Sequence, residues 1–373
     1  MLIVFSGNTS WSMYNFRLGL LKNLLSNGYK VCVIAPKDEY TEKIIEAGID
    51  FYPVKKLNRS GINPFEDFFL LNEYIKIYKK LQPDFIFHYT IKPNIYGTLA
   101  AKYCKIGSIS IATGLGNAFS KKGMLFYFVK YLYKLSSYFS KEIWFLNESD
   151  KLVFEEHKII TKGNVFILPG EGVNTSVFYP SKKIITEETT QFLLVSRMLY
   201  DKGVQVFVEA SKLLIAKGYI IHSKLLGQLD SGNPESISLK TILTWEKEGI
   251  ISYLGSSNNV SQYIENASVV VLPSYREGIP KVLLEAASME KPIITTNVPG
   301  CKEVVDDGIN GYLCEPKDVI GLSEKMIQFI HLPAEEKNKM GKAGREKVLQ
   351  QFDEKIIIDI YKEKLAQYSI LPK

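Results

Sequence analysis

Two glutamates lie eight positions apart in the segment PSYREGIPKVLLEA (273–286), a spacing suited to ligand binding. Glu277 comes directly before a Gly-Ile-Pro turn, and Glu285 lies in the apolar run that follows. Glycine frees the backbone at such a turn, and proline suits the first position of a helix. The sequence therefore predicts a helix N-terminus whose amides and dipole face an anion. The expected ligand contacts from this turn are Gly278, Ile279, Pro280, Lys281 and Val282.

The two carboxylates are placed to contact different parts of one elongated ligand. A helix rises roughly 1.5 Å per residue, so Glu285 reaches past an anion bound at the N-terminus. A carboxylate accepts two hydroxyl hydrogen bonds, which matches the vicinal diol of a ribose. The pattern indicates a nucleotide sugar, with the ribose at Glu285 and the hexose at Glu277. The structural alternative is a helix cap at Glu277 and a solvent-exposed Glu285.

Two cations follow an expected strand in the segment VSRMLYDKG (195–203). The fork of Arg197 and the point charge of Lys202 can together neutralise a diphosphate. Two solvated surface cations are the alternative interpretation. Their position at the carboxyl end of a strand favours the diphosphate, because ligands of open α/β sheets bind at that edge.

The first loop of the chain, FSGNTSW (5–11), also follows an expected strand. Gly7 allows the backbone to approach a ligand closely, although an ordinary tight turn explains it equally well. The loop is not a GxGxxG motif, so a dinucleotide-dependent oxidoreductase is disfavoured.

Two further loops of the first half carry candidate acceptor-binding residues. HYTIKPNIYG (88–97) contains His88, for which a core or capping role is the alternative, and Lys92, which can hold an anion. ATGLGNAF (112–119) has two glycines and no charge, which suits packing against a bulky substrate. The acceptor-side candidates are His88, Lys92, Thr113 and Gly114.

The stretch KKGMLFYFVKYLYKLSSYFSK (121–141) interleaves aromatic residues with lysines. An ordinary helix with snorkelling lysines is one interpretation, and a surface lying on an anionic membrane is the other. Residues 1–180 contain 22 Lys and Arg against 15 Asp and Glu, whereas the remainder contains 24 against 25. This asymmetry favours an anionic partner for the first half. The lysines are Lys121, Lys122, Lys130, Lys134 and Lys141.

Short apolar runs that alternate with helical patterns must position these residues. Such alternation predicts an α/β protein built from two doubly wound parallel sheets. The expected strands are 2–5, 29–35, 50–54, 84–89, 191–197, 222–227, 251–255, 267–273 and 291–296, and the clearest helices are 14–28, 68–81 and 354–368.

The Gly- and Pro-rich stretch LPGEGVNTSVFYPSKK (168–183) predicts the joint between two domains. We expect an acceptor-binding, membrane-facing domain at 1–175 and a donor-binding domain at 176–350. A terminal helix at 351–373 is expected to pack back toward the first domain. The carboxyl edges of both sheets would then face a cleft.

Composition limits the class of protein, its compartment and its partners. The 373 residues are 46% hydrophobic and 23% charged, which is ordinary for a globular protein. Four cysteines form no CxxC pair, which favours a reduced, cytoplasmic compartment. We see no signal peptide and no apolar run of about 18 residues. A net charge of +6 without a recognition motif disfavours a nucleic-acid binder.

The motif REGIPKVLLEA resembles the E-x7-E signature of the retaining glycosyltransferases of family 4, which have the GT-B fold. Glu277 and Glu285 match its glutamates, and Arg197 and Lys202 match the family's donor-phosphate pair. The resemblance to the sequences of this family extends over most of residues 190–320. YTIKPNIYG, ATGLG and GQLDSGNPESI resemble a narrower group that builds bacterial surface polysaccharides and lipid-linked oligosaccharides, including N-acetylgalactosaminyltransferases.

The resemblance implies retaining transfer from a UDP-hexose or a UDP-N-acetylhexosamine, with N-acetylgalactosamine as the first candidate. Arg197 and Lys202 would stabilise the leaving diphosphate, Glu277 would contact the transferred sugar, and Glu285 the ribose. The backbone from Tyr253 to Gly255 would hold the base. No DxD pair stands at a suitable strand end, so no metal is expected.

The resemblance is incomplete on the acceptor side. Many family members have a histidine on a first-domain loop, and ATGLGNAF has none. The departing phosphate would then take the acceptor's proton. The expected partners are a nucleotide sugar, a lipid-linked or oligosaccharide acceptor, and the inner face of an anionic cytoplasmic membrane. A sugar-nucleotide 2-epimerase and a non-catalytic sugar-nucleotide-binding protein are the competing hypotheses.

Overall fold

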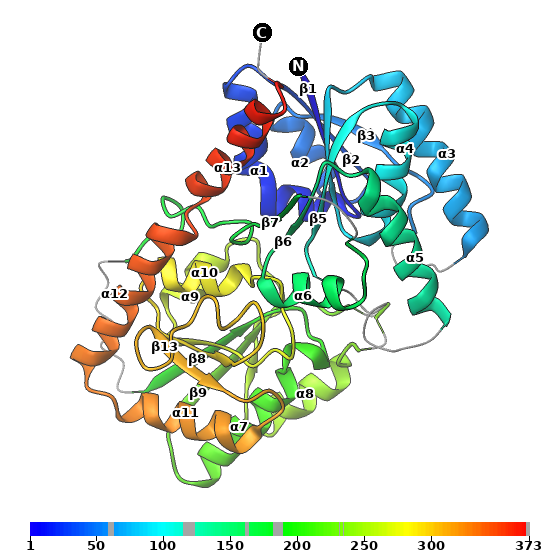
Figure 1. The fold of residues 1–373 in the computed structure, drawn as a ribbon. Coiled ribbons are helices and arrows are strands. Elements are labelled where there is room, and N and C mark those ends of the chain that lie inside the picture. Colours follow the sequence, from blue (N-terminus) through cyan, green and yellow to red (C-terminus); the bar gives the residue numbers. More distant parts are fainter. Residues whose placement is uncertain are drawn as a thin grey trace. The chain divides into compact units, whose positions relative to one another are not determined.

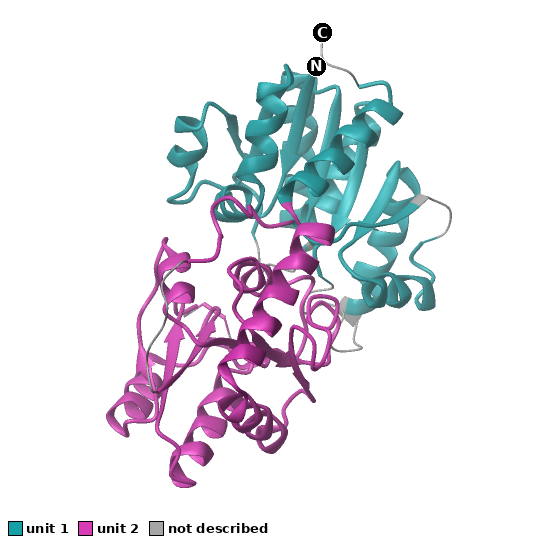
Figure 2. Cartoon of the chain, turned by 90° about the vertical axis from the view of Figure 1, so that its left-hand side faces the viewer, with its two compact units in different colours: residues 1–171, 354–373 teal, residues 172–353 magenta. Residues whose placement is uncertain are grey.

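The structure, a computed structural model, describes residues 1–58, 63–114, 124–160, 164–181, 189–230, 232–233 and 235–370. The chain forms two compact units, coloured separately in Figure 2. Unit 1 contains residues 1–171 and 354–373, and unit 2 contains residues 172–353. The chain thus passes between the units at 171/172 and 353/354, where the sequence predicted boundaries at 175/176 and 350/351.

Unit 1 is built on a seven-stranded parallel sheet with the order β3-β2-β1-β4-β5-β6-β7. The chain winds outward from β1 to β3 and then returns to β4, so the order reverses between β1 and β4. The strands are β1 (Leu2–Ser6), β2 (Lys30–Ala35), β3 (Asp50–Pro53), β4 (Phe85–Tyr89), β5 (Gly107–Ala112), β6 (Glu142–Phe145) and β7 (Asn164–Ile167).

Helices cover both faces of this sheet (Figure 1). They are α1 (Ser10–Ser26), α2 (Thr41–Glu46), α3 (Pro64–Leu81), α4 (Thr98–Tyr103), α5 (Met124–Phe139), α6 (Glu148–Glu156) and α13 (Glu354–Gln367), with a π-helical turn at Pro93–Gly97. Helices α1 and α3 each begin four residues earlier than the hydrophobic pattern predicted. The reason is capping: the side chains of Thr9 and Asn63 accept hydrogen bonds from first-turn amides.

The C-terminal helix α13 is part of unit 1. Glu142, buried on β6, accepts hydrogen bonds from Lys364 Nζ at 2.9 Å and from Tyr368 Oη at 2.8 Å. The hydroxyls of Tyr89 and Tyr361 lie 2.6 Å apart. These buried polar contacts hold the returning chain against strands β4 and β6 of unit 1, because leaving such groups unpaired would be costly.

Unit 2 is built on a six-stranded parallel sheet with the order β10-β9-β8-β11-β12-β13. Its order reverses between β8 and β11. The strands are β8 (Thr190–Val195), β9 (Ile221–Leu226), β10 (Ser252–Tyr253), β11 (Val269–Leu272), β12 (Ile293–Thr296) and β13 (Gly311–Cys314); the helices are α7 (Val204–Ala216), α8 (Leu239–Lys247), α9 (Val260–Glu265), α10 (Lys281–Ser288), α11 (Val319–His331) and α12 (Ala334–Gln351).

Two buried apolar clusters fill the two faces of the unit 2 sheet. One includes Phe207 of α7 and Phe329 of α11, and the other includes Leu283 of α10 and Val348 of α12. The predicted class, two doubly wound parallel α/β halves, is confirmed. Within the described part of the chain, no helix combines the length and apolar character needed to cross a bilayer.

Candidate functional site

The site predicted for the donor lies where the strand order of unit 2 reverses. Parallel pairing of β8 with β11 brings the loop after β8 next to the loop after β11. The two loops are joined directly, because Tyr275 N donates to Asp201 O at 2.8 Å. Crevices at such reversal points are the usual ligand sites of open α/β sheets.

Lys202 and Glu277 meet at this point. Lys202 Nζ lies 2.7 Å from Glu277 Oε1, and the two side chains are only 16% and 14% exposed. Glu277 is not a cap of α10, because Pro280 occupies the N-cap position and no side chain caps that helix. The capping alternative is therefore excluded. A lysine and a glutamate held together at a strand end can contact one ligand that carries both phosphate and hydroxyl groups.

Arg197 is held by Asp230, a residue that the sequence analysis did not select. Arg197 Nη1 lies 2.8 Å from Asp230 Oδ2. Asp230 belongs to the loop after β9, which pairs with the Arg197 loop through Met198 N to Gln228 O at 3.1 Å. The signal was present in GQLDSGNPESI, but only this pairing shows that its aspartate faces the arginine. Asp230 fixes the direction of the guanidinium.

Three glycines let these loops approach one another. A Cβ at Gly203 would fall 1.9 Å from Pro273 O, and one at Gly227 would fall 1.7 Å from Ser196 O. At Gly300 it would fall 2.3 Å from Gly278 O. All three have positive φ, which disfavours other residues independently of space. The site is therefore assembled by close contact between backbones.

Helix α10 presents its N-terminus beside this pair. Pro280 is the N-cap residue, not the first helical residue as predicted, because its ψ of 115° is extended. Glu285 lies further along the helix, and its side chain is partly buried. Desolvation raises the pKa of Glu285, and nearby Lys281 opposes the rise. A partly buried carboxylate is suited to accept hydroxyl hydrogen bonds.

The peptide expected to hold the base is already engaged with the protein. Tyr253 Oη donates to Gly227 O at 2.8 Å, and Tyr253 N donates to Glu246 Oε1 at 2.9 Å. Gly255 O accepts from Gly227 N at 2.7 Å. Tyr253 and Gly255 thus support the glycine turn after β9, and their role toward a base stays a prediction.

In unit 1, His88 has a structural role, which corrects its selection as an acceptor-side candidate. The side chain is fully buried, with Nε2 2.8 Å from Tyr78 Oη and Nδ1 3.1 Å from Thr98 Oγ1. Burial lowers the pKa of His88 to about 3, so the ring is neutral. Strand β4 is central in the sheet and helices cover it, which encloses this side chain.

Replacing His88 by Ala is expected to lower the free energy of unfolding by about 2–4 kcal/mol while leaving turnover by the folded enzyme within about twofold.

The stability of the wild type should also depend on pH through His88. Below pH 6.5 the histidine of the unfolded chain binds a proton, whereas the buried histidine of the folded protein stays neutral. The wild type should therefore lose about 1 kcal/mol more than the variant between pH 7 and pH 5.5. Denaturant titrations at both values, with exposed His222→Ala as control, measure this. A turnover loss without destabilisation would restore His88 to the site.

Lys92 forms an ion pair with Asp67. Its Nζ lies 2.6 Å from Asp67 Oδ1, and Tyr96 Oη donates to Asp67 Oδ2 at 2.7 Å. Thr113 and Gly114 follow β5 and are partly exposed. The rest of the ATGLGNAF loop, 115–119, lies outside the described residues, as do Lys121 and Lys122.

Gly7 follows β1, on the other side of the unit 1 order reversal, and its amide donates to Ile34 O at 3.0 Å. A Cβ there would meet only the end of the flexible Met13 side chain. Close packing therefore does not require glycine at this position, and its predicted contact with the donor is untested by the geometry of unit 1.

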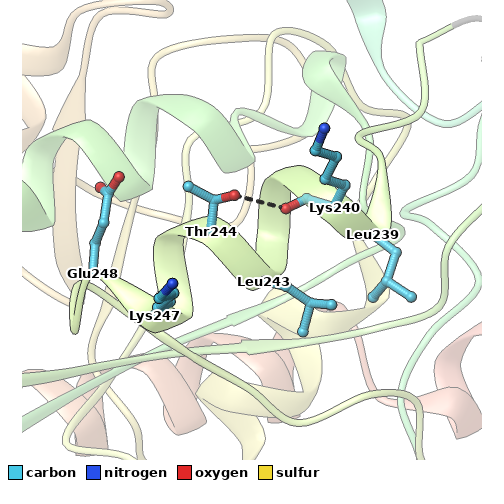
Figure 3. Close-up of a pocket in the computed structure, with 6 residues that line it drawn as sticks. All are labelled: Leu239, Lys240, Leu243, Thr244, Lys247 and Glu248. Carbon is cyan, nitrogen blue, oxygen red and sulfur yellow. Dashed lines mark hydrogen bonds between the residues drawn. The ribbon is translucent and has the colours of Figure 1, made fainter.

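A shallow hollow lies along α8 in unit 2 (Figure 3). Its lining residues come from this helix and its C-cap residue Glu248, and a hydrogen bond runs from Thr244 Oγ1 to Lys240 O at 2.9 Å. None of the predicted site residues lines this hollow, so it is separate from the candidate donor site at the strand ends.

Across the described residues, no cluster of three His, Cys, Asp or Glu side chains is arranged to hold a metal.

Comparison with known proteins shows the family of the chain. Residues 178–347 match the family described as glycosyl transferases group 1, and residues 2–147 match glycosyl transferase 4-like proteins. The chain is 30% identical, over 97% of both chains, to the N,N'-diacetylbacillosaminyl-diphospho-undecaprenol alpha-1,3-N-acetylgalactosaminyltransferase of Campylobacter jejuni. It is 29% identical, over 79% of both chains, to the capsular polysaccharide biosynthesis glycosyltransferase CapM of Staphylococcus aureus.

A solved structure shows the same fold. The Anabaena protein HepE in complex with UDP superposes with a TM-score of 0.80, over 98% of this chain and 100% of that one, at 16% identity. The predicted GT-B fold is confirmed.

Proposed function

Because the chain belongs to the glycosyl transferases group 1 family and is a glycosyltransferase, we propose that it transfers an N-acetylhexosamine, with N-acetylgalactosamine as first candidate, from a UDP-sugar to a lipid-linked glycan. The observation that carries this proposal is the Lys202–Glu277 pair at the order reversal of the unit 2 sheet. The acceptor class follows the named activity of the Campylobacter relative. Both curated relatives described above are transferases, which favours transfer over the 2-epimerase alternative.

Different residues of unit 2 bind different parts of the donor. Arg197, Lys202 and the N-terminus of α10 hold the diphosphate, Glu285 takes the ribose hydroxyls, and Glu277 contacts the transferred sugar. These charges are placed before the reaction begins, since Asp230 and Glu277 already hold the two cations. Preorganised charge of this kind commonly supplies the largest contribution to catalysis.

Transfer proceeds with retention at the anomeric carbon. The acceptor hydroxyl oxygen forms a bond to that carbon, and the bond from the carbon to the β-phosphate oxygen breaks, leaving its electron pair on UDP. The departing diphosphate takes the hydroxyl proton, and Arg197 and Lys202 stabilise its negative charge. The chemistry uses no metal.

Thermal unfolding with a panel of UDP-, GDP- and ADP-sugars tests the proposal. A ligand that binds only the folded state must raise Tm. We expect the largest rise with one UDP-N-acetylhexosamine, about equal with and without EDTA, and a much smaller rise in a Lys202→Ala variant. No rise with any UDP-sugar, or a larger rise with another nucleotide, would overturn the donor assignment. A rise that EDTA abolishes would overturn metal independence.

We also place the protein at the inner face of the cytoplasmic membrane, in peripheral contact with anionic lipid. Helix α5 supports this, because Tyr127, Tyr131 and Tyr138 are exposed along it together with Lys134. Tyrosine and lysine are the side chains that favour the headgroup level of a bilayer. A lipid-linked acceptor requires the enzyme to work at that level.

A further inference from the structure

The first two turns of α3 expose three phenylalanines. Phe65, Phe68 and Phe69 are 79%, 61% and 58% exposed, and the rings of Phe68 and Phe69 lie 6.1 Å apart. Removing a phenylalanine side chain from water is favourable, so three that are exposed together can contribute binding free energy to a partner. Contiguous exposed apolar side chains commonly mark an interaction surface.

The surroundings of this Phe cluster (Phe65, Phe68 and Phe69) indicate an anionic partner. Helix α3 packs against α4, and α4 packs against α5, on one side of the unit 1 sheet (Figure 1). Between Asp84 and Glu142 the sequence contains no acidic residue and eight lysines. All the charged side chains of helices α4 and α5 are therefore lysines. Exposed aromatic side chains continue along them at Tyr103 and on α5.

The Phe cluster is tied to the predicted acceptor loop. Asp67 lies between Phe65 and Phe68 in the first turn of α3, and its carboxylate accepts from both Lys92 and Tyr96. The Asp67 side chain is buried, so this link is shielded from solvent. The position of the first turn of α3 and the position of the loop after β4 are therefore coupled.

We propose that Phe65, Phe68 and Phe69 insert into the bilayer at the boundary between headgroups and acyl chains, and so set the acceptor loop at the height of the acceptor's diphosphate. This inference rests on the lipid-linked acceptor of the proposed function. The partner is the bilayer itself: the cluster supplies apolar insertion, and the lysines of α5 supply attraction to anionic lipid. Glu66, exposed in the same turn, stays at the headgroup surface and keeps the insertion shallow.

The two contributions predict different lipid dependence. Replacing all three phenylalanines by Ser should lower the partition coefficient on both neutral phosphatidylcholine vesicles and vesicles containing phosphatidylglycerol, by at least about 100-fold. Replacing Lys130 and Lys134 by Gln should lower it on the anionic vesicles only, because a neutral surface exerts no attraction on them.

Sedimentation of the full chain with both vesicle types measures this. The matched control replaces Val177, Tyr179 and Ile220 by Ser, since these unit 2 side chains are comparably exposed; it should bind as wild type does. Equal binding by the Phe variant and wild type on both vesicles would overturn the proposal. Loss in the unit 2 control as well would also overturn it, because adsorption would then be non-specific.

Activity separates this inference from the proposed function. The Phe variant should transfer sugar to a short-chain, water-soluble acceptor at the wild-type rate and lose at least about tenfold on a long-chain acceptor in vesicles. Equal rates on both acceptors would overturn the insertion role and leave the transferase intact. Absence of transfer by wild type to either acceptor would overturn the proposed function itself, while the vesicle-binding result would still decide the insertion.

Discussion

Glu277→Gln is expected to reduce kcat by on the order of 10²- to 10³-fold while the affinity for the UDP-sugar changes by less than about fivefold. The substitution keeps the shape of the side chain and removes the charge that faces the transferred sugar. Lys202, released from the 2.7 Å ion pair, remains free to hold the diphosphate. Single-turnover rates and donor titration, measured on the same preparation, separate the two effects.

The matched control for Glu277 is Glu315→Gln. Glu315 is an exposed glutamate just after β13, at the same edge of the same sheet. It should behave as wild type. Wild-type turnover in Glu277→Gln, or an equal loss in Glu315→Gln, would show that the assignment of Glu277 to the reacting sugar is wrong.

Gly300→Ala is expected to reduce turnover by at least about 100-fold without changing any charged group. The new Cβ would lie 2.3 Å from Gly278 O and 2.7 Å from Glu277 O, both backbone atoms that cannot rotate away. The segment that carries Glu277 must therefore move, and displacements of about 1 Å at a reacting centre cost on the order of 10²-fold.

Gly308→Ala separates this steric effect from backbone strain. Gly300 and Gly308 both have positive φ, 89° and 76°, but nothing lies within 4 Å of a Cβ built at Gly308. We expect both variants to lose about 1 kcal/mol of stability from the disfavoured backbone conformation, and only Gly300→Ala to lose turnover. Equal turnover in the two variants, measured at a temperature where both are folded, would show that the close approach is irrelevant to the site.

Most of the architecture followed from short-range patterns in the sequence. Apolar runs of strand length that alternate with helical periodicity specified a parallel α/β protein. The strands β6, β7 and β13 were not predicted, although they are as long as β11 and β12, which were predicted; their length therefore does not explain the omission. The caps at Thr9 and Asn63 were also missed, although both are residue types that favour such positions.

The turn around Glu277 could be predicted because all its parts are local. The glycine, the proline and the two glutamates lie within one loop and one helix, so spacing along the chain specifies their spacing in space. Only the exact helix start differed, since Pro280 caps α10 instead of opening it.

The partners of these residues depended on tertiary structure. Lys202 and Glu277 are 75 positions apart, and Arg197 and Asp230 are 33 apart. Each pair meets only because the strand order places β8 between β9 and β11. His88 stands at a strand end like the others, yet it is buried because β4 is central and covered by helices. Residue types and short spacings in the chain were enough to select the candidate site residues. Which of them meet depends on the order of the strands, because neighbours in a parallel sheet come from distant parts of the chain.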